Sequence, residues 1–455
     1  MSIVEVYLWG VKVGALGYSP DQTQFATFEY DKDFIKKGVE ISPIKVPTSI
    51  NIHTFENISY RTFHGLAGFI ADALPDKFGN QLIDQYFISK GKTSDDITAL
   101  DRLLYIGNRA MGALEFRTAI KLEKIDSSIA LNLNDLSTLA EMVINNKNEF
   151  EKKLQEADHQ TAINLLKIGS SAGGARSKAL VAIDKDGKLY DGTVNQKKKC
   201  EYFLLKFDSS SNSDRDHKDP KGMTKIEYIY SLIAANCGIN MPQTSFIENE
   251  EDFHFLIKRF DRIDKEGSVA KDRLHYVSWS GMAHAHRDSV GAYSYEQLVS
   301  VCRQMNLGEK AILEIFKRAI FNIVGRNQDD HTKNFGFLMN KQGQWSLSPA
   351  FDMTYSYDPS GMWTKNHQIN LNGKNNNFTK DDIVAFGNYC NLKEKKSIEI
   401  LENTIKQFKK FEQLADEYKV DTILRNTILK NINMQIILFI SKLLKKRIYE
   451  ISIGF

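Results

Sequence analysis

The order of its predicted elements constrains the fold of this chain more than any single motif does. A helical stretch over residues 131–167 ends in a glycine- and serine-rich loop. Apolar, strand-like segments follow at 179–183, 202–207 and 253–260. From Tyr295 onward the pattern becomes predominantly helical. A β-rich part with a glycine loop, followed by a helix and a helical half, is the layout of a bilobal fold that holds a nucleotide between its lobes.

The N-terminal part predicts a separate small subdomain. Residues 4–16 alternate in polarity around two glycines, as in two short strands joined by a tight turn, and residues 25–30 predict a further strand. A helical region begins at residues 63–70 and is broken at residues 74–76, and a second helix is predicted over residues 81–88. The predicted division is an N-terminal α+β subdomain at 1–120, the remainder of the N-terminal lobe at 121–260 and a helical C-terminal lobe at 261–455.

The composition is that of an ordinary globular protein. It argues against a nucleic-acid substrate, a zinc site and a disulfide framework. The 455 residues are 42% hydrophobic and 26% charged, enough to bury a core without disulfides or metals. The formal net charge of +3 is too small to favour nucleic acid as the main substrate. The four cysteines lie far apart and form no C-x-x-C pair, so we expect reduced thiols rather than a zinc site or a disulfide framework.

No segment predicts insertion into a membrane. The N-terminus lacks a basic stretch followed by an apolar core, so no signal peptide is expected. The most apolar late stretch, residues 436–440, is too short to cross a bilayer, and we expect a buried helix there. These features predict a soluble, cytoplasmic protein.

The chemically richest segment runs from Asp329 to Asn334. Phosphoryl transfer needs a carboxylate beside the acceptor hydroxyl and hard oxygen ligands for Mg²⁺. An Asp followed five positions later by an Asn supplies both from one short loop, and the same spacing occurs in the protein-kinase catalytic loop. Lys333, beside them, would neutralise charge on the transferring group. The segment therefore predicts a magnesium-dependent phosphoryl-transfer centre.

Neighbouring residues leave alternatives open. Asp330 is a second carboxylate. The spacing of five positions from Asp329 to Asn334 favours Asp329 as the reactive one. His331 has no nearby His or Cys partners for Zn²⁺, so we expect it to orient the loop by hydrogen bonding. The structural alternative is that the two aspartates cap a helix while Asp352 sits in a turn.

A predicted hairpin brings in a second metal ligand. Residues 335–347 contain two apolar runs separated by a glycine turn. Asn334 precedes this hairpin and Asp352 follows it, so both lie on the same side of it. The hairpin alone would then bring two oxygen ligands for Mg²⁺ together, with no need for contacts between distant parts of the chain.

Residues 168–178 form a candidate phosphate loop. Their glycines, Gly169, Gly173 and Gly174, allow backbone N–H groups to approach phosphate oxygens closely. No Gly-Lys-[Ser/Thr] follows at the spacing of a Walker A loop. A glycine–serine loop between a helix and a strand is by itself more often a plain connector.

Lys206 lies inside an apolar strand, where an ammonium group is costly unless it is paired. A strand lysine in kinases contacts the nucleotide phosphates and pairs with a helix glutamate, for which Glu227 is the candidate. The alternative is an edge-strand lysine that faces solvent.

The strand over residues 255–260 continues into charged residues. The backbone of this stretch, which includes Lys258 and Phe260, is a candidate for contacting adenine. The side chains of Arg259 and Asp261 are expected instead to form a structural ion pair.

With these features assembled, the chain resembles the HipA family of toxin kinases from bacterial type II toxin–antitoxin systems, over nearly its whole length. The resemblance implies an α+β, bilobal protein-kinase-like fold with a small N-terminal subdomain and a largely helical C-terminal lobe. The motifs that carry it are residues 8–10, 28–30, 74–80, 101–107 and 111–116 in the N-terminal part, and residues 172–175, 258–262, 329–335, 352 and 371–374 in the kinase part.

The resemblance also implies residue roles. Asp329 would be the catalytic base, and Asn334 and Asp352 the Mg²⁺ ligands. The nucleotide-binding set would be Lys206 at the ATP phosphates, the loop backbone of Gly173, Gly174 and Ala175, and Lys258, Phe260 and His331. Ser171, or its neighbour Ser170, falls where the family carries an autophosphorylated regulatory serine. A phosphate there would repel bound phosphates and expel the loop.

Partners are implied by the resemblance alone. Family members phosphorylate serine or threonine on protein targets, aminoacyl-tRNA synthetases being the known kind, and many are neutralised by a helix-turn-helix antitoxin that binds operator DNA. The chain would then touch DNA only through such a partner or weakly. Two other readings stay open, a non-enzymatic corepressor with a kinase fold and a small-molecule phosphotransferase.

Overall fold

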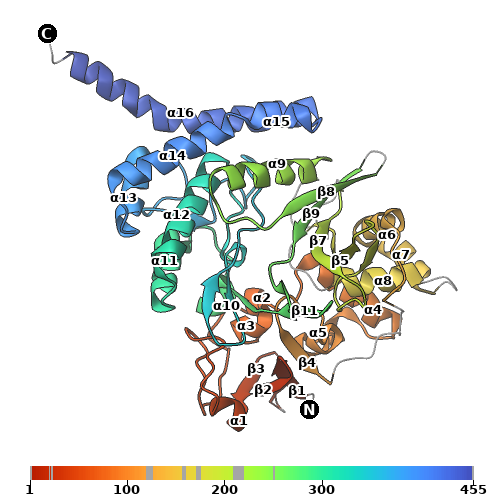
Figure 1. Cartoon of the computed structure of the whole chain (residues 1–455). Coiled ribbons are helices and arrows are strands. Elements are labelled where there is room, and N and C mark those ends of the chain that lie inside the picture. The colour runs from red at the N-terminus through yellow and green to blue at the C-terminus, as the bar shows by residue number, and fades with distance from the viewer. Residues whose placement is uncertain are drawn as a thin grey trace. The chain divides into compact units, whose positions relative to one another are not determined.

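The computed structural model describes residues 3–19, 21, 24–118, 127–155, 160–170, 176–208, 220–249 and 252–452, with the backbone alone for 155 and 440–452. They form two compact units (Figure 1). The first unit comprises Met1–Thr224, Pro242–Asp288 and Gly336–Ser348, and the second comprises Lys225–Met241, Ser289–Phe335 and Pro349–Phe455. Both are assembled from separate segments, so the division predicted along the chain at residues 120 and 260 stays a prediction.

The first unit begins with a four-stranded antiparallel sheet in the order β3-β2-β1-β4. Alternate residues of its first strand are fully buried, as the polarity pattern of residues 4–16 predicts. Its strands are β1 (Ile3–Leu8), β2 (Val11–Tyr18), β3 (Ala26–Tyr30) and β4 (Leu114–Arg117). The helices between them are α1 (Lys32–Ile35), α2 (Tyr60–Phe63), α3 (Gly68–Ala71), α4 (Lys77–Ser89), the 3-10 turn η1 (Ser94–Asp96) and α5 (Ala99–Ile106).

A second, five-stranded sheet of the first unit has the order β6-β5-β7-β9-β8. Its strands are β5 (Lys178–Asp184), β6 (Leu189–Asp191), β7 (Cys200–Lys206), β8 (Thr244–Asn249) and β9 (Asp252–Lys258). Alternate residues such as Val181, Leu205 and Leu256 form one core with apolar residues of α4, α6 (Leu133–Asn145), α7 (Lys147–Gln155) and α8 (Gln160–Gly169). Figure 1 shows these helices gathered beside the sheet. One face is thus covered by helices, and Lys206 belongs to the other face.

Short strands complete the first unit. They are β10 (Arg262–Asp264), β11 (Lys271–Arg273), β12 (His275–Ser278), β14 (Gly336–Met339) and β15 (Trp345–Leu347), with α10 (Trp279–Ala283) after β12. The pairing of Phe337 with Leu347 and of Met339 with Trp345 confirms the predicted hairpin before Asp352.

The second unit is mainly helical, as predicted from Tyr295 onward. Its central helix, α12, is buried along most of its length and contacts α11, α13, α14 and α16. The elements are α9 (Met223–Asn236, which begins at the unit boundary), α11 (Tyr295–Gln304), α12 (Gly308–Val324), the 3-10 turn η2 (Thr332–Asn334), α13 (Lys380–Tyr389), α14 (Glu394–Phe408), α15 (Phe411–Glu417) and α16 (Thr422–Ser452), with the parallel pair β13 (Tyr293–Ser294) and β16 (Ile369–Asn370).

One burial prediction for α16 is wrong in part. The apolar run at 436–440 is helical, but Ile437 is 58% and Leu438 40% exposed, while Ile436 and Phe439 are buried. An α-helix completes one turn every 3.6 residues, so a continuous apolar run places side chains on both its buried and its exposed face. No helix in the described part of the chain is long and apolar enough to span a bilayer. The four cysteines are free and buried, as expected.

Candidate functional site

The candidate catalytic segment begins where α12 ends. Arg326 takes a left-handed conformation with φ 57°, and this breaks the helix. The Tyr230 hydroxyl donates to the Gly325 carbonyl at 2.7 Å. The Arg326 guanidinium lies 4.0 Å from the centre of the Tyr357 ring and donates to Gln435 Oε1 at 3.2 Å. Contacts from three separate elements therefore fix the start of the loop.

Asp330 is a buried anchor of this loop. Its carboxylate accepts hydrogen bonds from the Tyr295 hydroxyl at 2.7 Å and the Gln368 backbone N–H at 2.8 Å, and lies 2.9 Å from His367 Nδ1. Burial, and then the nearby charge of Asp330, raise the pKa of Tyr295 well above its usual value, so the phenol keeps its proton and remains a donor. A carboxylate with this many partners and no exposed surface serves to hold the backbone in place.

Asp329 has the opposite setting. Its side chain is 38% exposed, and the Trp363 indole N–H donates to its Oδ1 at 3.0 Å. His331 Nε2 lies 4.0 Å from the same oxygen. Of the two adjacent aspartates, only Asp329 therefore presents an accessible carboxylate, and this geometry favours it as the base.

Asn334 and Asp352 have the chemistry of Mg²⁺ ligands. The Asn334 amide donates through Nδ2 to the Asp329 carbonyl at 2.7 Å, which leaves its Oδ1 free to point away from that bond. Asp352 takes a left-handed conformation with φ 53°, and its carbonyl accepts from Asn327 Nδ2 at 3.2 Å.

The oxygens around this loop fit a hard cation. The buried side-chain oxygens of Asn327 and Gln328 have no hydrogen-bond partner within the described ranges. In those same ranges, no group of three or more His, Cys, Asp or Glu side chains is placed to hold a metal. A carboxylate and an amide oxygen suit Mg²⁺, which takes its remaining ligands from phosphates and water, better than Zn²⁺.

Lys333 lies within η2, and His331 is the residue just before it. Thr332 and Asn334 belong to the same 3-10 turn as Lys333, and the Asn334 N–H donates to the His331 carbonyl at 2.9 Å. Lys333 and His331 are thus brought into one turn with Asn334. Their roles toward a nucleotide stay predictions.

In the first unit, Lys206 lies directly opposite Lys178 across the β5–β7 pair. Both side chains are buried, and residues paired in this way share one face of a sheet. It is the face opposite the helices, because the alternating residues Ala179 and Leu205 lie in the helix-covered core. Lys178 was not identified from the sequence. The register of β5 and β7 places it opposite Lys206.

The predicted partner of Lys206, Glu227, lies on α9 in the second unit, where it is buried. Because the two residues belong to different units, their pairing stays a prediction.

Most of the glycine loop lies outside the described residues, including Ser171, Gly173, Gly174 and Ala175. Ser170 is described, and its buried hydroxyl donates to the Leu166 carbonyl at the end of α8. Ser170 is therefore a poor phosphate acceptor in this conformation, which favours Ser171.

Lys258 is not brought together with Lys206. Lys258 pairs with Phe203, a member of the helix-covered core, and its Nζ lies 2.6 Å from Glu201 Oε2. Its side chain therefore points to the opposite face from Lys206, and only its backbone remains a candidate for nucleotide contact. The Phe260 ring centre lies 6.0 Å from that of Tyr276.

The expected ion pair between Arg259 and Asp261 is confirmed. Arg259 donates to both carboxylate oxygens of Asp261, at 2.9 and 2.7 Å, and both side chains are buried. Burial alone would raise the pKa of Asp261, but the charges of Arg259 and Arg262 hold it well below its usual value. The pair is structural.

Sequence reasoning missed the residues that hold the catalytic loop. Tyr295, Trp363, His367 and Gln368 contact Asp329 or Asp330 but lie more than thirty residues from them along the chain. None of them belongs to a motif with recognisable spacing, so no signal in a single sequence identifies them.

Comparison with known proteins gives consistent findings. Residues 170–411 match the model of the HipA-like C-terminal domain, and residues 4–117 match that of the HipA N-terminal domain. A putative kinase of Haemophilus influenzae is 28% identical over 144 residues, which are 29% of this chain and only 40% of that protein. The serine/threonine-protein kinase toxin HipA of Shewanella oneidensis is 22% identical over 368 residues, 77% of this chain and 74% of that protein.

A solved structure shows the same fold. A chain from the Shewanella oneidensis MR-1 toxin–antitoxin complex of HipA, HipB and operator DNA superposes with a TM-score of 0.61 and 16% identity, over 95% of both chains. The similarity confirms the expected α+β, protein-kinase-like fold.

Proposed function

This chain belongs to the HipA family, and we propose that it is an ATP- and Mg²⁺-dependent kinase that phosphorylates serine or threonine in a protein target. Family membership confirms the predicted class of enzyme, a protein kinase. The observation that carries the proposal is the contrast between two adjacent aspartates. Asp330 is buried and fully engaged, whereas Asp329 is 38% exposed and lies in one loop with Asn334.

The proposed reaction assigns each group one task. Asp329 orients the acceptor hydroxyl and takes its proton, as the hydroxyl oxygen bonds to the γ-phosphorus of ATP and the bond to the β–γ bridging oxygen breaks. Lys333 stabilises charge on the transferring group. Asn334 and Asp352 would hold Mg²⁺, which when bound neutralises phosphate charge. Lys206 and Lys178 would hold the nucleotide phosphates.

We further propose that Ser171 is the site of autophosphorylation. The buried Ser170 hydroxyl supports this choice between the two serines. A phosphate on the loop would place about two negative charges beside bound nucleotide and so lower its affinity.

The proposed biological setting is a cytoplasmic toxin–antitoxin pair. The solved relative is a complex of HipA with HipB and operator DNA, which supports a DNA-binding antitoxin partner for this chain and only indirect contact with DNA. The protein target is proposed by family likeness to be of the aminoacyl-tRNA synthetase kind.

The test is transfer from γ-labelled ATP with Mg²⁺, combined with intact-mass and peptide analysis of the protein after expression. We expect the wild type to carry phosphate on Ser171 and Asp329→Asn to carry none, with at least a 100-fold loss of transfer, about the contribution of a general base. Asp381→Asn, an exposed aspartate at the start of α13, is the matched control. A wild-type preparation that binds ATP but labels neither itself nor any protein would refute the proposal.

A further inference from the structure

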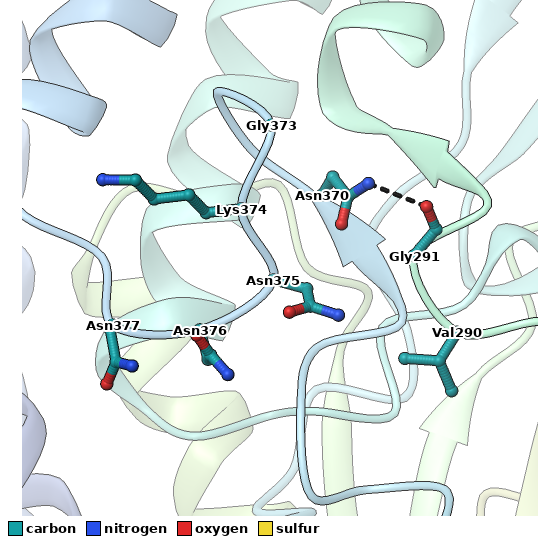
Figure 2. Close-up of a pocket in the computed structure, with 8 residues that line it drawn as sticks. All are labelled: Val290, Gly291, Asn370, Gly373, Lys374, Asn375, Asn376 and Asn377. Carbon is teal, nitrogen blue, oxygen red and sulfur yellow. Dashed lines mark hydrogen bonds between the residues drawn. The ribbon is translucent and has the colours of Figure 1, made fainter.

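An asparagine-lined pocket lies in the second unit, with a volume of about 600 Å³. Its polar lining comes from Asn370, Asn375, Asn376 and Asn377, together with Lys374 and the backbone of Gly291. Figure 2 shows the Asn370 and Asn375 side chains between the Gly373–Lys374 turn and the Val290–Gly291 segment, with Asn370 Nδ2 donating to the Gly291 carbonyl at 2.7 Å. The proposed reaction uses none of these residues.

The pocket is built on the same segment that holds the catalytic loop. Residues 363–377 contact Asp329 through the Trp363 indole and Asp330 through the Gln368 N–H. The carbonyl of Gln368 accepts from the Gly291 N–H at 2.9 Å, so one residue joins the anchor of the catalytic loop to the pocket wall. A molecule in this pocket would therefore contact the same segment, residues 363–377, whose Trp363 indole donates to Asp329.

The pocket is nearly neutral. The ammonium group of Lys374 lies 2.8 Å from the Asp382 carboxylate, which compensates its charge. Nucleic acids and phosphate groups are held by clusters of uncompensated cations, and apolar ligands by apolar walls. Side-chain amides instead offer paired donors and acceptors. These match the N–H and C=O groups of a polypeptide.

Gly291 keeps the pocket in shape. Its φ of 72° favours glycine, and a Cβ added there would lie 3.1 Å from Asn370 Oδ1 and 3.4 Å from Asn375 Nδ2. The amides thus pack against bare backbone, and a side chain at this position would displace them.

We propose that this pocket binds the stretch of polypeptide that flanks the acceptor serine or threonine of the protein substrate. The asparagine amides would hydrogen-bond its backbone and polar side chains. This inference rests on the proposed kinase function and adds the means of substrate recognition.

The test uses Asn375→Asp, which places a carboxylate in the pocket, and Asn388→Asp on the exposed surface of α13 as the matched control. Each full-length protein is assayed with γ-labelled ATP and Mg²⁺ on positional-scanning libraries of serine and threonine peptides. We expect Asn375→Asp to gain about tenfold selectivity for Lys or Arg at one position near the acceptor, equivalent to about 1.4 kcal/mol. The KM for ATP should not change, and Asn388→Asp should keep the wild-type selectivity.

Each other outcome has a defined meaning. Equal peptide selectivity for Asn375→Asp and the control overturns the inference and leaves the kinase proposal intact. The same holds if the wild type labels itself but none of the library peptides. A wild type that binds ATP and transfers phosphate to nothing overturns the proposed function itself. Thermal unfolding of both variants reports whether a loss of transfer is only a loss of fold.

Discussion

At the scale of single residues, the site depends on two adjacent aspartates with opposite surroundings. Asp330 accepts hydrogen bonds from Tyr295 and Gln368 in the interior, while Asp329 receives one bond from Trp363 and stays accessible. Because their side chains have different partners, Asp330 can anchor the loop while Asp329 stays available for the proposed reaction. The alternative that the two aspartates cap a helix does not describe Asp330, whose carboxylate accepts from Tyr295 and Gln368, while His331 is the N-cap residue of η2.

This contrast predicts different effects on stability. Asp330→Ala leaves a buried phenol and a buried N–H without their acceptor, and should lower the free energy of unfolding by about 3 kcal/mol. Asp329→Ala should change it by less than about 1 kcal/mol, because the side chain is partly exposed. Urea unfolding of the two variants checks this. Equal losses of stability would contradict the assigned anchoring role.

His275 makes folding sensitive to acid. Its ring is fully buried, Nε2 lies 3.0 Å from the Ile41 carbonyl, and burial lowers its pKa to about 4. The unfolded chain has the ordinary pKa near 6.5, so between pH 6.5 and 4 it binds a proton that the folded chain does not. The free energy of unfolding should therefore fall by about 3 kcal/mol from this residue as the pH drops through that window.

His275→Gln keeps a donor for the Ile41 carbonyl and removes the titration. Its stability should decline less steeply than that of the wild type from pH 6.5 to 4, while the difference between the two proteins stays constant above pH 7. Chemical unfolding at several pH values measures both slopes. Parallel slopes would show that His275 does not carry this dependence.

At the scale of elements, the five-stranded sheet separates two lysines that look alike in sequence. Lys206 ends β7 on the face opposite the helices, across from Lys178, and Lys258 ends β9 on the helix-covered face beside Glu201. Successive side chains of a strand point to opposite faces of the sheet, so the register alone decides on which face each lysine lies.

The two lysines should therefore respond differently to the same substitution. Lys206→Met should weaken ATP binding at least about tenfold, because it removes a charge expected at the phosphates. Lys258→Met should leave ATP affinity unchanged and lose only a partly exposed ion pair, worth less than about 1 kcal/mol. Titration calorimetry with ATP and Mg²⁺ compares them. A similar loss of affinity in both variants would place Lys258 at the nucleotide after all.

At the scale of the whole molecule, polar contacts join the HipA N-terminal domain to residues 261–273, which follow β9, within the first unit. The Gly112 N–H donates to the buried Asp261 at 2.8 Å, and Arg273 Nε donates to the Gly112 carbonyl at 2.8 Å. The Trp9 indole donates to the Arg273 carbonyl at 2.7 Å. These bonds give a physical reason for the Gly112 motif, whose φ of 76° only glycine adopts readily.

Removing only one partner of the buried Arg259–Asp261 ion pair should destabilise the fold strongly. Asp261→Ala leaves the Arg259 charge without its carboxylate and should lower the free energy of unfolding by about 3–5 kcal/mol. The double variant Arg259→Met/Asp261→Ala removes both charges and should lose less stability than the sum of the losses of Arg259→Met and Asp261→Ala. Denaturant unfolding of all four proteins completes the cycle, and additive losses would contradict the assigned coupling.

Much of the fold could be read from local patterns. The strands around residues 4–16 and 179–207, the hairpin before Asp352 and the helices after Tyr295 follow from polarity period and turn chemistry, which act over a few residues. It was harder to predict which apolar side chains are buried, as the exposed Ile437 and Leu438 show. Their exposure depends on which face of α16 meets its neighbours, and no local pattern records that when a run is apolar throughout.

The sequence by itself determined which groups are available for the proposed reaction, namely the loop from Asp329 to Asn334, Asp352 and Lys206, because reactive groups and their spacing are properties of the chain. Tertiary structure alone decided which aspartate is buried, which lysine shares a face with Lys206 and which distant residues hold the loop. Register, burial and contacts across more than thirty residues arise only when the whole chain packs, so no single segment encodes them. The asparagine pocket belongs to this second kind, since it forms where residues 290–291 meet residues 370–377.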